Sequence, residues 1–134
     1  MGLLDDIGDV LTSAGVVVKG QNLFKHDMPD GPDEALSLMT YPGGPPVWSM
    51  ASTRPQAEQP RFQLKVRHPH PASAAAWAND AYRVLDSLGD RRINGVRYLA
   101  VYALQNPFFL QKDPANRFLW AVNFEAIRES ASSS

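Results

Sequence analysis

The clearest pattern of apolar and polar positions lies in the middle of the chain. Residues 62–67 read FQLKVR, in which every second side chain is apolar, as expected for a strand with one buried face. The HPHP run at 68–71 ends this strand, because proline donates no backbone hydrogen bond and restricts the residue before it. Pro71 suits the first turn of a helix. Apolar residues then recur at helical spacing and predict one buried stripe, made of Trp77, Ala81, Val84, Leu85 and Leu88. Gly89 is expected to end this helix in the left-handed conformation.

A second helical stripe occupies the N-terminus. Its apolar members are Leu3, Leu4, Ile7, Val10, Leu11 and Ala14. Asp5 and Asp6 fall in the first turn, where carboxylates favour the helix dipole, and Gly15 is expected to end the helix. Short strands follow at 23–25 and 35–41, separated by turn residues at 28–33.

The C-terminal half predicts further antiparallel strands. Asn94-Gly95 favours the type I′ turn of a hairpin. The strand predicted at 96–105 places Tyr98, Ala100, Tyr102 and Leu104 on one face and Leu99, Val101 and Ala103 on the other. The strand at 117–127 is also apolar on both faces, so both faces are expected to be covered. The helices cover one side or one side each, and the alternative is that a neighbouring subunit covers the second side. Residues 107–110 form an apolar run and 113–116 a turn.

The segment 42–60 breaks the pattern. It holds five prolines and two adjacent glycines, so we expect a long loop that cannot join the sheet. Trp48 either folds back over the sheet edge of its own subunit or contacts a partner. A subunit or tube interface is therefore predicted at Val47, Trp48, Met50, Arg54, Phe108, Phe109 and Leu110.

Composition places the chain among folded globular proteins. The chain has 134 residues, of which 44% are hydrophobic and 20% charged. We expect one domain over 1–129 with its long loop at 42–60, followed by a frayed tail at 130–134. A net charge of −1 argues against a dedicated nucleic-acid binder. The absence of cysteine fits a reducing cytoplasm. No apolar run approaches the roughly 20 residues of a membrane span. The acidic N-terminus argues against a signal peptide.

Candidate chemistry is sparse. His68 and His70 share a face if extended, with His26 and Asp27 as possible helpers, but this spacing favours solvated loop histidines over a metal site. Prolines between Asp27, Asp30 and Asp33 spoil a calcium loop. No phosphate-binding loop, dinucleotide fingerprint or nucleophile elbow occurs. The sequence predicts no catalytic, metal or cofactor site and no enzyme.

Several short motifs, in their joint order, resemble the phage minor capsid and tail-completion proteins, in particular the tail-terminator type of long-tailed double-stranded DNA phages. They are LLDDI at 3–7, LF at 23–24, MPD at 28–30, YPGGPP at 41–46, QLKVR at 63–67, LDSL at 85–88, INGVRY at 93–98, QNPFFL at 105–110, Asp113, Arg117 and VNF at 122–124. The resemblance implies an α+β fold, a twisted, mostly antiparallel sheet with two helices packed on it. It also implies a virion structural protein without catalytic residues.

The same resemblance implies partners. Related terminators form a hexameric ring that ends the tail tube and joins it to the head–neck connector proteins, while genomic DNA passes the lumen without specific binding. The expected location is the tail–neck region of the virion, after synthesis in the host cytoplasm. Alternatives are a neck connector or minor capsid protein of similar fold, a small ligand-binding domain, which would show an apolar pocket, or an enzyme with an unrecognised site, which would show shifted pKa values.

Overall fold

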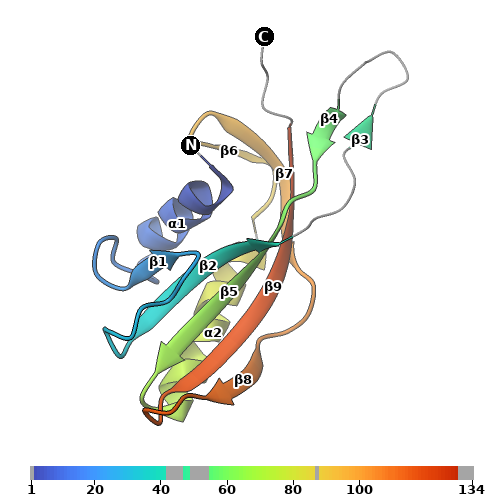
Figure 1. Ribbon diagram of the computed structural model, residues 1–134. Coiled ribbons are helices and arrows are strands. Elements are labelled where there is room, and N and C mark those ends of the chain that lie inside the picture. Colours follow the sequence, from blue (N-terminus) through green and yellow to red (C-terminus); the bar gives the residue numbers. More distant parts are fainter. Residues whose placement is uncertain (1, 42–46, 49–54, 87, 130–134) are drawn as a thin grey trace.

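One long strand, β9 (Phe118–Glu129), runs through the whole sheet and joins its parts (Figure 1). The computed structural model describes residues 2–41, 47–48, 55–86 and 88–129, with only the backbone at 47–48 and 55–56. Before β9 these residues form α1 (Leu3–Ser13), β1 (Leu23–Lys25), β2 (Ala35–Tyr41), β3 (Val47–Trp48), β4 (Pro55–Glu58), β5 (Arg61–His68), α2 (Pro71–Asp86), β6 (Arg91–Ile93), β7 (Val96–Ala103) and β8 (Phe108–Lys112).

The register around β9 defines the sheet. On one side β9 pairs antiparallel with β5 and then, in the same register, with β4. On its other side β9 pairs with β8 near its beginning and with β7 near its end. Strand β2 pairs with β5, β3 with β4 and β6 with β7, all antiparallel, whereas β1 runs parallel to β2. The predicted α+β class, with a mostly antiparallel sheet, is confirmed.

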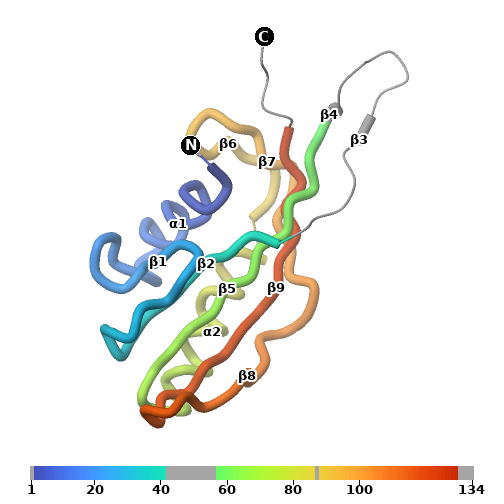
Figure 2. The backbone as a smooth tube through the Cα atoms, in the orientation of Figure 1, coloured from blue at the N-terminus to red at the C-terminus, as the bar shows by residue number. Residues whose placement is uncertain are grey.

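Both helices lie on the same face of the sheet (Figures 1 and 2). The inward side chains of β5, Phe62, Leu64 and Val66, are fully buried in one core that includes residues from α1 and α2. Helix α2 contacts β5, β7 and β9, and α1 contacts α2 and β2. Of the arrangements that the sequence left open, the structure therefore has both helices on one side. None of the described helices is long and apolar enough to span a bilayer.

Two predicted helix ends have different outcomes. Gly15 ends α1 as predicted, with φ +79 and a hydrogen bond from the Val16 N–H to the Leu11 carbonyl at 3.0 Å. Gly89 does not adopt the left-handed conformation, so that prediction is wrong. Helix α2 already ends at Asp86, whose carboxylate accepts a hydrogen bond from the Ala103 N–H at 2.7 Å. This hydrogen bond to β7 fixes the end of α2, so the helix does not need a left-handed residue at Gly89 to end it.

The predicted stripe of α2 is confirmed for Ala81, Leu85 and, just past the end of the helix, Leu88, and the buried face extends to two further alanines. Its buried residues are Ala74, Ala78, Ala81 and Leu85. Trp77 and Val84, which the sequence placed in the stripe, are only half-buried. The alanines let the helix approach the sheet closely, and the indole N–H of Trp77 donates to the Val16 carbonyl at 2.9 Å. Trp77 thus lies at the margin of the core, where its indole N–H has a backbone partner.

Two predictions about the C-terminal strands need correction. Strand β7 ends at Ala103, and a bulge between Tyr98 and Ala100 moves Tyr98 to the face of Val101 and Ala103. Strict alternation predicts Tyr98 on the same face as Ala100. The one extra residue at the bulge turns Tyr98 to the other face, where the core lies. The apolar run at 107–110, to which the sequence assigned no element, forms part of strand β8.

The prediction that 42–60 cannot join the sheet is wrong for the described part of this segment. Strand β4 pairs with both β3 and the end of β9. Pro55 opens β4, where a strand tolerates proline because its first residue need not donate. We call β3 and β4 together the arm. Residues 42–46 and 49–54, which include the candidate interface residues Met50 and Arg54, lie outside the described residues.

The Asn94-Gly95 turn is confirmed, with φ of 51 and 82 between β6 and β7. Gly95→Val is expected to lower the free energy of unfolding by about 1–3 kcal/mol, because a β-branched residue resists a positive φ. The measurement is urea unfolding monitored by circular dichroism. Gly89→Ala is the matched control, since Gly89 has no positive φ and nothing within 4 Å of an added Cβ. Equal effects of the two substitutions would contradict this account of the turn.

Candidate assembly surfaces

The arm reaches past the ends of β2 and β5, away from both helices (Figure 1). The arm pairs with the end of β9, where Ala57 lies opposite Glu129 and Glu58 lies opposite Arg128. Val47 and Trp48, two of the predicted interface residues, form β3, which pairs only with β4 among the described strands. The arm is thus a two-stranded ribbon held to the subunit at its base, and such a ribbon is marginally stable by itself.

A chain of polar contacts connects the base of the arm to α1. The Arg128 Nε donates to the Glu58 carboxylate at 2.9 Å, and its Nη1 donates to the Tyr98 hydroxyl at 3.3 Å. The Tyr98 hydroxyl in turn donates to Asp6 at 2.5 Å. Asp6 and Tyr98 are both 0% exposed. The sequence predicts only a helix-dipole role for Asp6, because nothing in a single sequence pairs it with a tyrosine 92 positions away.

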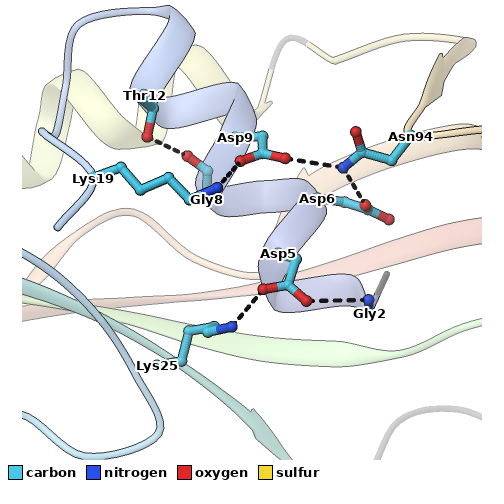
Figure 3. A network of polar contacts seen from close by, with 9 residues as sticks. All are labelled: Gly2, Asp5, Asp6, Gly8, Asp9, Thr12, Lys19, Lys25 and Asn94. Carbon is cyan, nitrogen blue, oxygen red and sulfur yellow. Dashed lines mark hydrogen bonds and ion pairs between the residues drawn. The ribbon is translucent and has the colours of Figure 1, made fainter.

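Further contacts attach α1 to its surroundings (Figure 3). The Asn94 amide donates to Asp6 at 2.7 Å and to Asp9 at 3.0 Å, so the hairpin turn is tied to the helix. Lys19 forms an ion pair with Asp9 at 3.0 Å, and Lys25 pairs with Asp5. The Asn94 amide and then Lys19 lower the pKa of Asp9, and the hydrogen bond from Lys25 lowers that of Asp5. These contacts fix the position of α1 over the sheet.

Stability is expected to fall at alkaline pH because of Tyr98. Burial, and then the hydrogen bond to Asp6, raises the pKa of the Tyr98 hydroxyl. The folded state therefore favours the neutral hydroxyl, so its contribution is complete below the unfolded pKa of about 10 and is lost as the pH rises above it. Urea unfolding at a series of pH values checks this. The decline above about pH 10 should be smaller in Tyr98→Phe than in the unchanged protein; identical slopes would contradict it.

Strand β8 carries the other three predicted interface residues. Phe108 is half-buried, whereas Phe109 and Leu110 are 50% and 39% exposed. A bulge between Phe109 and Gln111 leaves Leu110 without a partner residue in β9. The Phe109 ring lies 6.2 Å from Trp120 and 6.3 Å from Phe118, measured between centroids. The structure thus separates the predicted residues into two groups, one in the arm and one on β8.

The sheet face opposite the helices carries several charged and polar side chains that pair with one another. Glu125 is 7% exposed and accepts from Arg61 at 3.1 Å and from the Tyr102 hydroxyl. The hydrogen bond from Tyr102 pairs two side chains from β7 and β9. Ala121 lies on this face between Lys65 of β5 and Phe108 of β8, and it is fully buried. The alternating polar residues of β5 were the sequence signal for this face.

Two arginines fasten the β1–β2 connection to the same face. Arg117 donates to the Asp30 carbonyl at 2.5 Å and pairs with Asp113 at 2.8 Å. Arg67 donates to the Pro32 carbonyl at 2.5 Å. Burial, and then the charge of Arg117, lowers the pKa of Arg67. Both guanidinium groups serve the fold here, because they hold a loop that would otherwise have few contacts with the sheet.

The histidines are not brought together as a metal centre. The His68 Nε2 lies 3.3 Å from Glu34, and its Nδ1 accepts a hydrogen bond from the His70 N–H at 3.0 Å. His26 belongs to the β1–β2 connection, where it has φ 71. Over the described ranges, no three His, Cys, Asp or Glu side chains gather in a way that could hold a metal ion.

Comparison with known proteins identifies the class. The sequence model of the family described as bacteriophage tail terminator protein matches residues 10–130. The protein is therefore a structural protein of a phage tail. It belongs to the bacteriophage tail terminator family, as its motifs predicted.

Solved structures share the fold. A chain of the virion of a native gene transfer agent particle is 20% identical and superposes with a TM-score of 0.65, over 96% of this chain and 95% of that one. Another solved chain is 12% identical and has a TM-score of 0.52, over 98% of this chain and 100% of that one. No curated protein sequence matches. At these identities the two structures establish similarity of fold.

Proposed function

We propose that the protein closes into a ring, of six subunits, that ends the phage tail tube and joins it to the head–neck connector proteins. The family match over residues 10–130 carries this proposal. The ring belongs to the tail–neck region of the virion, in keeping with the similarity to a virion chain of a gene transfer agent. Its role is structural, without catalysis or a cofactor.

A closed ring suits the physical problem at the end of a tube. The exposed edges of the last tube layer otherwise continue to accept subunits, and a ring that covers these edges and presents a different surface on its outer face stops further addition. Each subunit of a cyclic ring needs two unlike surfaces, one for each neighbour. The arm and β8 lie near opposite ends of β9 (Figure 1), which supports a head-to-tail arrangement.

The charge of the chain fits a passage for DNA. Genomic DNA moves through the lumen of such a ring, and clustered lysines and arginines would bind its phosphates and slow it. A net charge of −1 avoids this strong, sequence-independent binding. Many of the arginines in the described residues are paired with carboxylates within the subunit, among them Arg61, Arg97, Arg117 and Arg128.

The mass of the assembly tests the proposal. Light scattering of the purified chain, alone and with tail tube protein, is expected to give a species near six times the chain mass of 14.8 kDa in at least one of the two samples. A chain that stays monomeric in both samples and does not bind tube protein would overturn the proposal. Binding to connector proteins but not to the tube would instead identify a neck connector.

The backbone amides of the arm are expected to become better protected from hydrogen exchange on assembly. Strand β4 has only two register pairs with β9, so its amides should exchange rapidly in the free subunit and slowly in the ring. Holding the arm rigid against a neighbour costs conformational entropy, roughly 1 kcal/mol or more for each residue that is fixed. A contact through Trp48 must offset this cost. Trp48→Ala should therefore prevent assembly, while Val18→Ala, at a position that is 49% exposed, should not. Equal protection of β4 in both states would show that Trp48 serves its own subunit.

A further inference from the structure

The least protected strand edge in the described part of the chain belongs to β8. Three other strands, β1, β3 and β6, also pair on one side only. Strand β6 has three residues and carries the exposed Arg91 and Arg92, and β1 is equally short, with its Lys25 paired to Asp5. Short length and charge are the usual means of preventing unwanted pairing of edges. Strand β8 has five residues and presents two large apolar side chains, so it lacks both means.

The charged side chain of β8, Lys112, contacts an aromatic ring of the neighbouring strand β9. Lys112 is the one charged residue of this strand, and its Nζ lies 5.3 Å from the centre of the Phe118 ring. This cation–π contact holds the ammonium group against β9. The residue at the bulge is Leu110, an apolar side chain that is 39% exposed. The edge thus presents unpaired backbone groups together with apolar side chains.

Phe109 is positioned in advance for a contact. Its ring meets Trp120 edge-on and Phe118 at a tilt, yet half of its surface remains exposed. An aromatic side chain that is already held by its neighbours loses little rotamer freedom on binding, which is the property of an interface anchor.

We infer that the outer edge of β8 in one subunit pairs with the outer edge of β3 from the arm of the next subunit. This inference rests on the proposed ring and names the contact that closes it. Both residues of β3, Val47 and Trp48, are apolar, and this strand has no second partner among the described residues. The added strand extends the sheet of one subunit with the ribbon of its neighbour, which gives the arm the third strand that a marginal ribbon needs.

The location of the two edges selects a head-to-tail contact. Strand β3 lies on the β2 side of the sheet, whereas β8 lies on the other side of β9 and near its opposite end. Joining these unlike edges leaves one free β3 and one free β8 at the ends of any open chain, so the contact repeats from subunit to subunit. It closes a ring when the rotation between neighbours divides a full turn. Pairing of β8 with β8 would instead stop at a two-fold dimer.

Cysteine cross-linking tests this pairing, because the protein has no cysteine of its own. The variant carrying Val47→Cys and Gln111→Cys is oxidised under the conditions in which light scattering finds the ring. Denaturing gels should show a ladder of cross-linked species up to the full ring, whereas each single variant should give dimers at most. A ring that forms without the ladder would overturn this contact and leave the ring intact. Absence of any ring would overturn the proposed function itself, and the contact with it.

A pair of matched substitutions provides a second readout. Phe109→Asp should weaken ring formation about tenfold or more, as expected for a hot-spot residue. Val18→Asp changes a side chain of nearly equal exposure, 49% against 50%, on a segment outside both edges, and should leave the ring unchanged. Circular dichroism should show both variants folded. Unchanged assembly of Phe109→Asp, or cross-linking of Gln111→Cys alone at the level of the double variant, would overturn the inference.

Discussion

Replacing Phe124 with alanine is expected to lower the free energy of unfolding by about 3–5 kcal/mol, the usual cost of deleting a buried aromatic side chain. Phe124 of β9 lies directly opposite Phe62 of β5, and the two rings stack with centroids 5.2 Å apart and an interplanar angle of 13°. Both residues are 0% exposed. The substitution leaves a cavity between the sheet and the helices, where the surrounding side chains can relax only in part.

Phe109→Ala is the control for this measurement. Phe109 lies on the same sheet but half of its surface is exposed, so its removal should cost the isolated subunit less than about 1 kcal/mol. Urea unfolding with unchanged m-values would show that both numbers report stability. A loss below about 1 kcal/mol for Phe124→Ala would contradict the single core described here.

Asp6→Ala is expected to lower the free energy of unfolding by about 2–3 kcal/mol, because it leaves the buried Tyr98 hydroxyl without its acceptor. The carboxylate accepts from the Tyr98 hydroxyl at 2.5 Å and from the Asn94 amide at 2.7 Å. Water cannot replace it without entering the space between α1 and β7. The same carboxylate lies in the first turn of α1, so its removal also loses a favourable interaction with the helix dipole.

Asp9→Ala offers a close comparison. Asp9 shares the Asn94 donor with Asp6 and pairs with Lys19, but its side chain is 30% exposed. Solvent screens this pair, and we expect a loss below about 1 kcal/mol. If the two aspartates cost the same in urea unfolding, the burial of Asp6 would not be the source of its effect.

Local patterns predicted many of the elements. Alternation in FQLKVR gave β5, Pro71 gave the start of α2, and Asn94-Gly95 gave the β6–β7 turn. Each of these signals acts within a few residues of its cause, through a fixed φ, a missing N–H or the side-chain period of a strand. The edge role of β8 was not predicted, because an apolar run alone does not distinguish an edge strand from a buried one.

The sequence by itself determined the helical stripe of α1, the strands around the central helix and the turns at Gly15 and Asn94-Gly95. It also indicated, through its short motifs, the family to which the chain belongs. Only the tertiary structure decided that both helices share one face, that a bulge turns Tyr98 toward Asp6, and that Arg128 links this pair to the arm. The physical reason is range. A turn or a stripe is set by neighbours along the chain, whereas a bulge, a buried carboxylate and a free edge depend on which distant strand lies alongside.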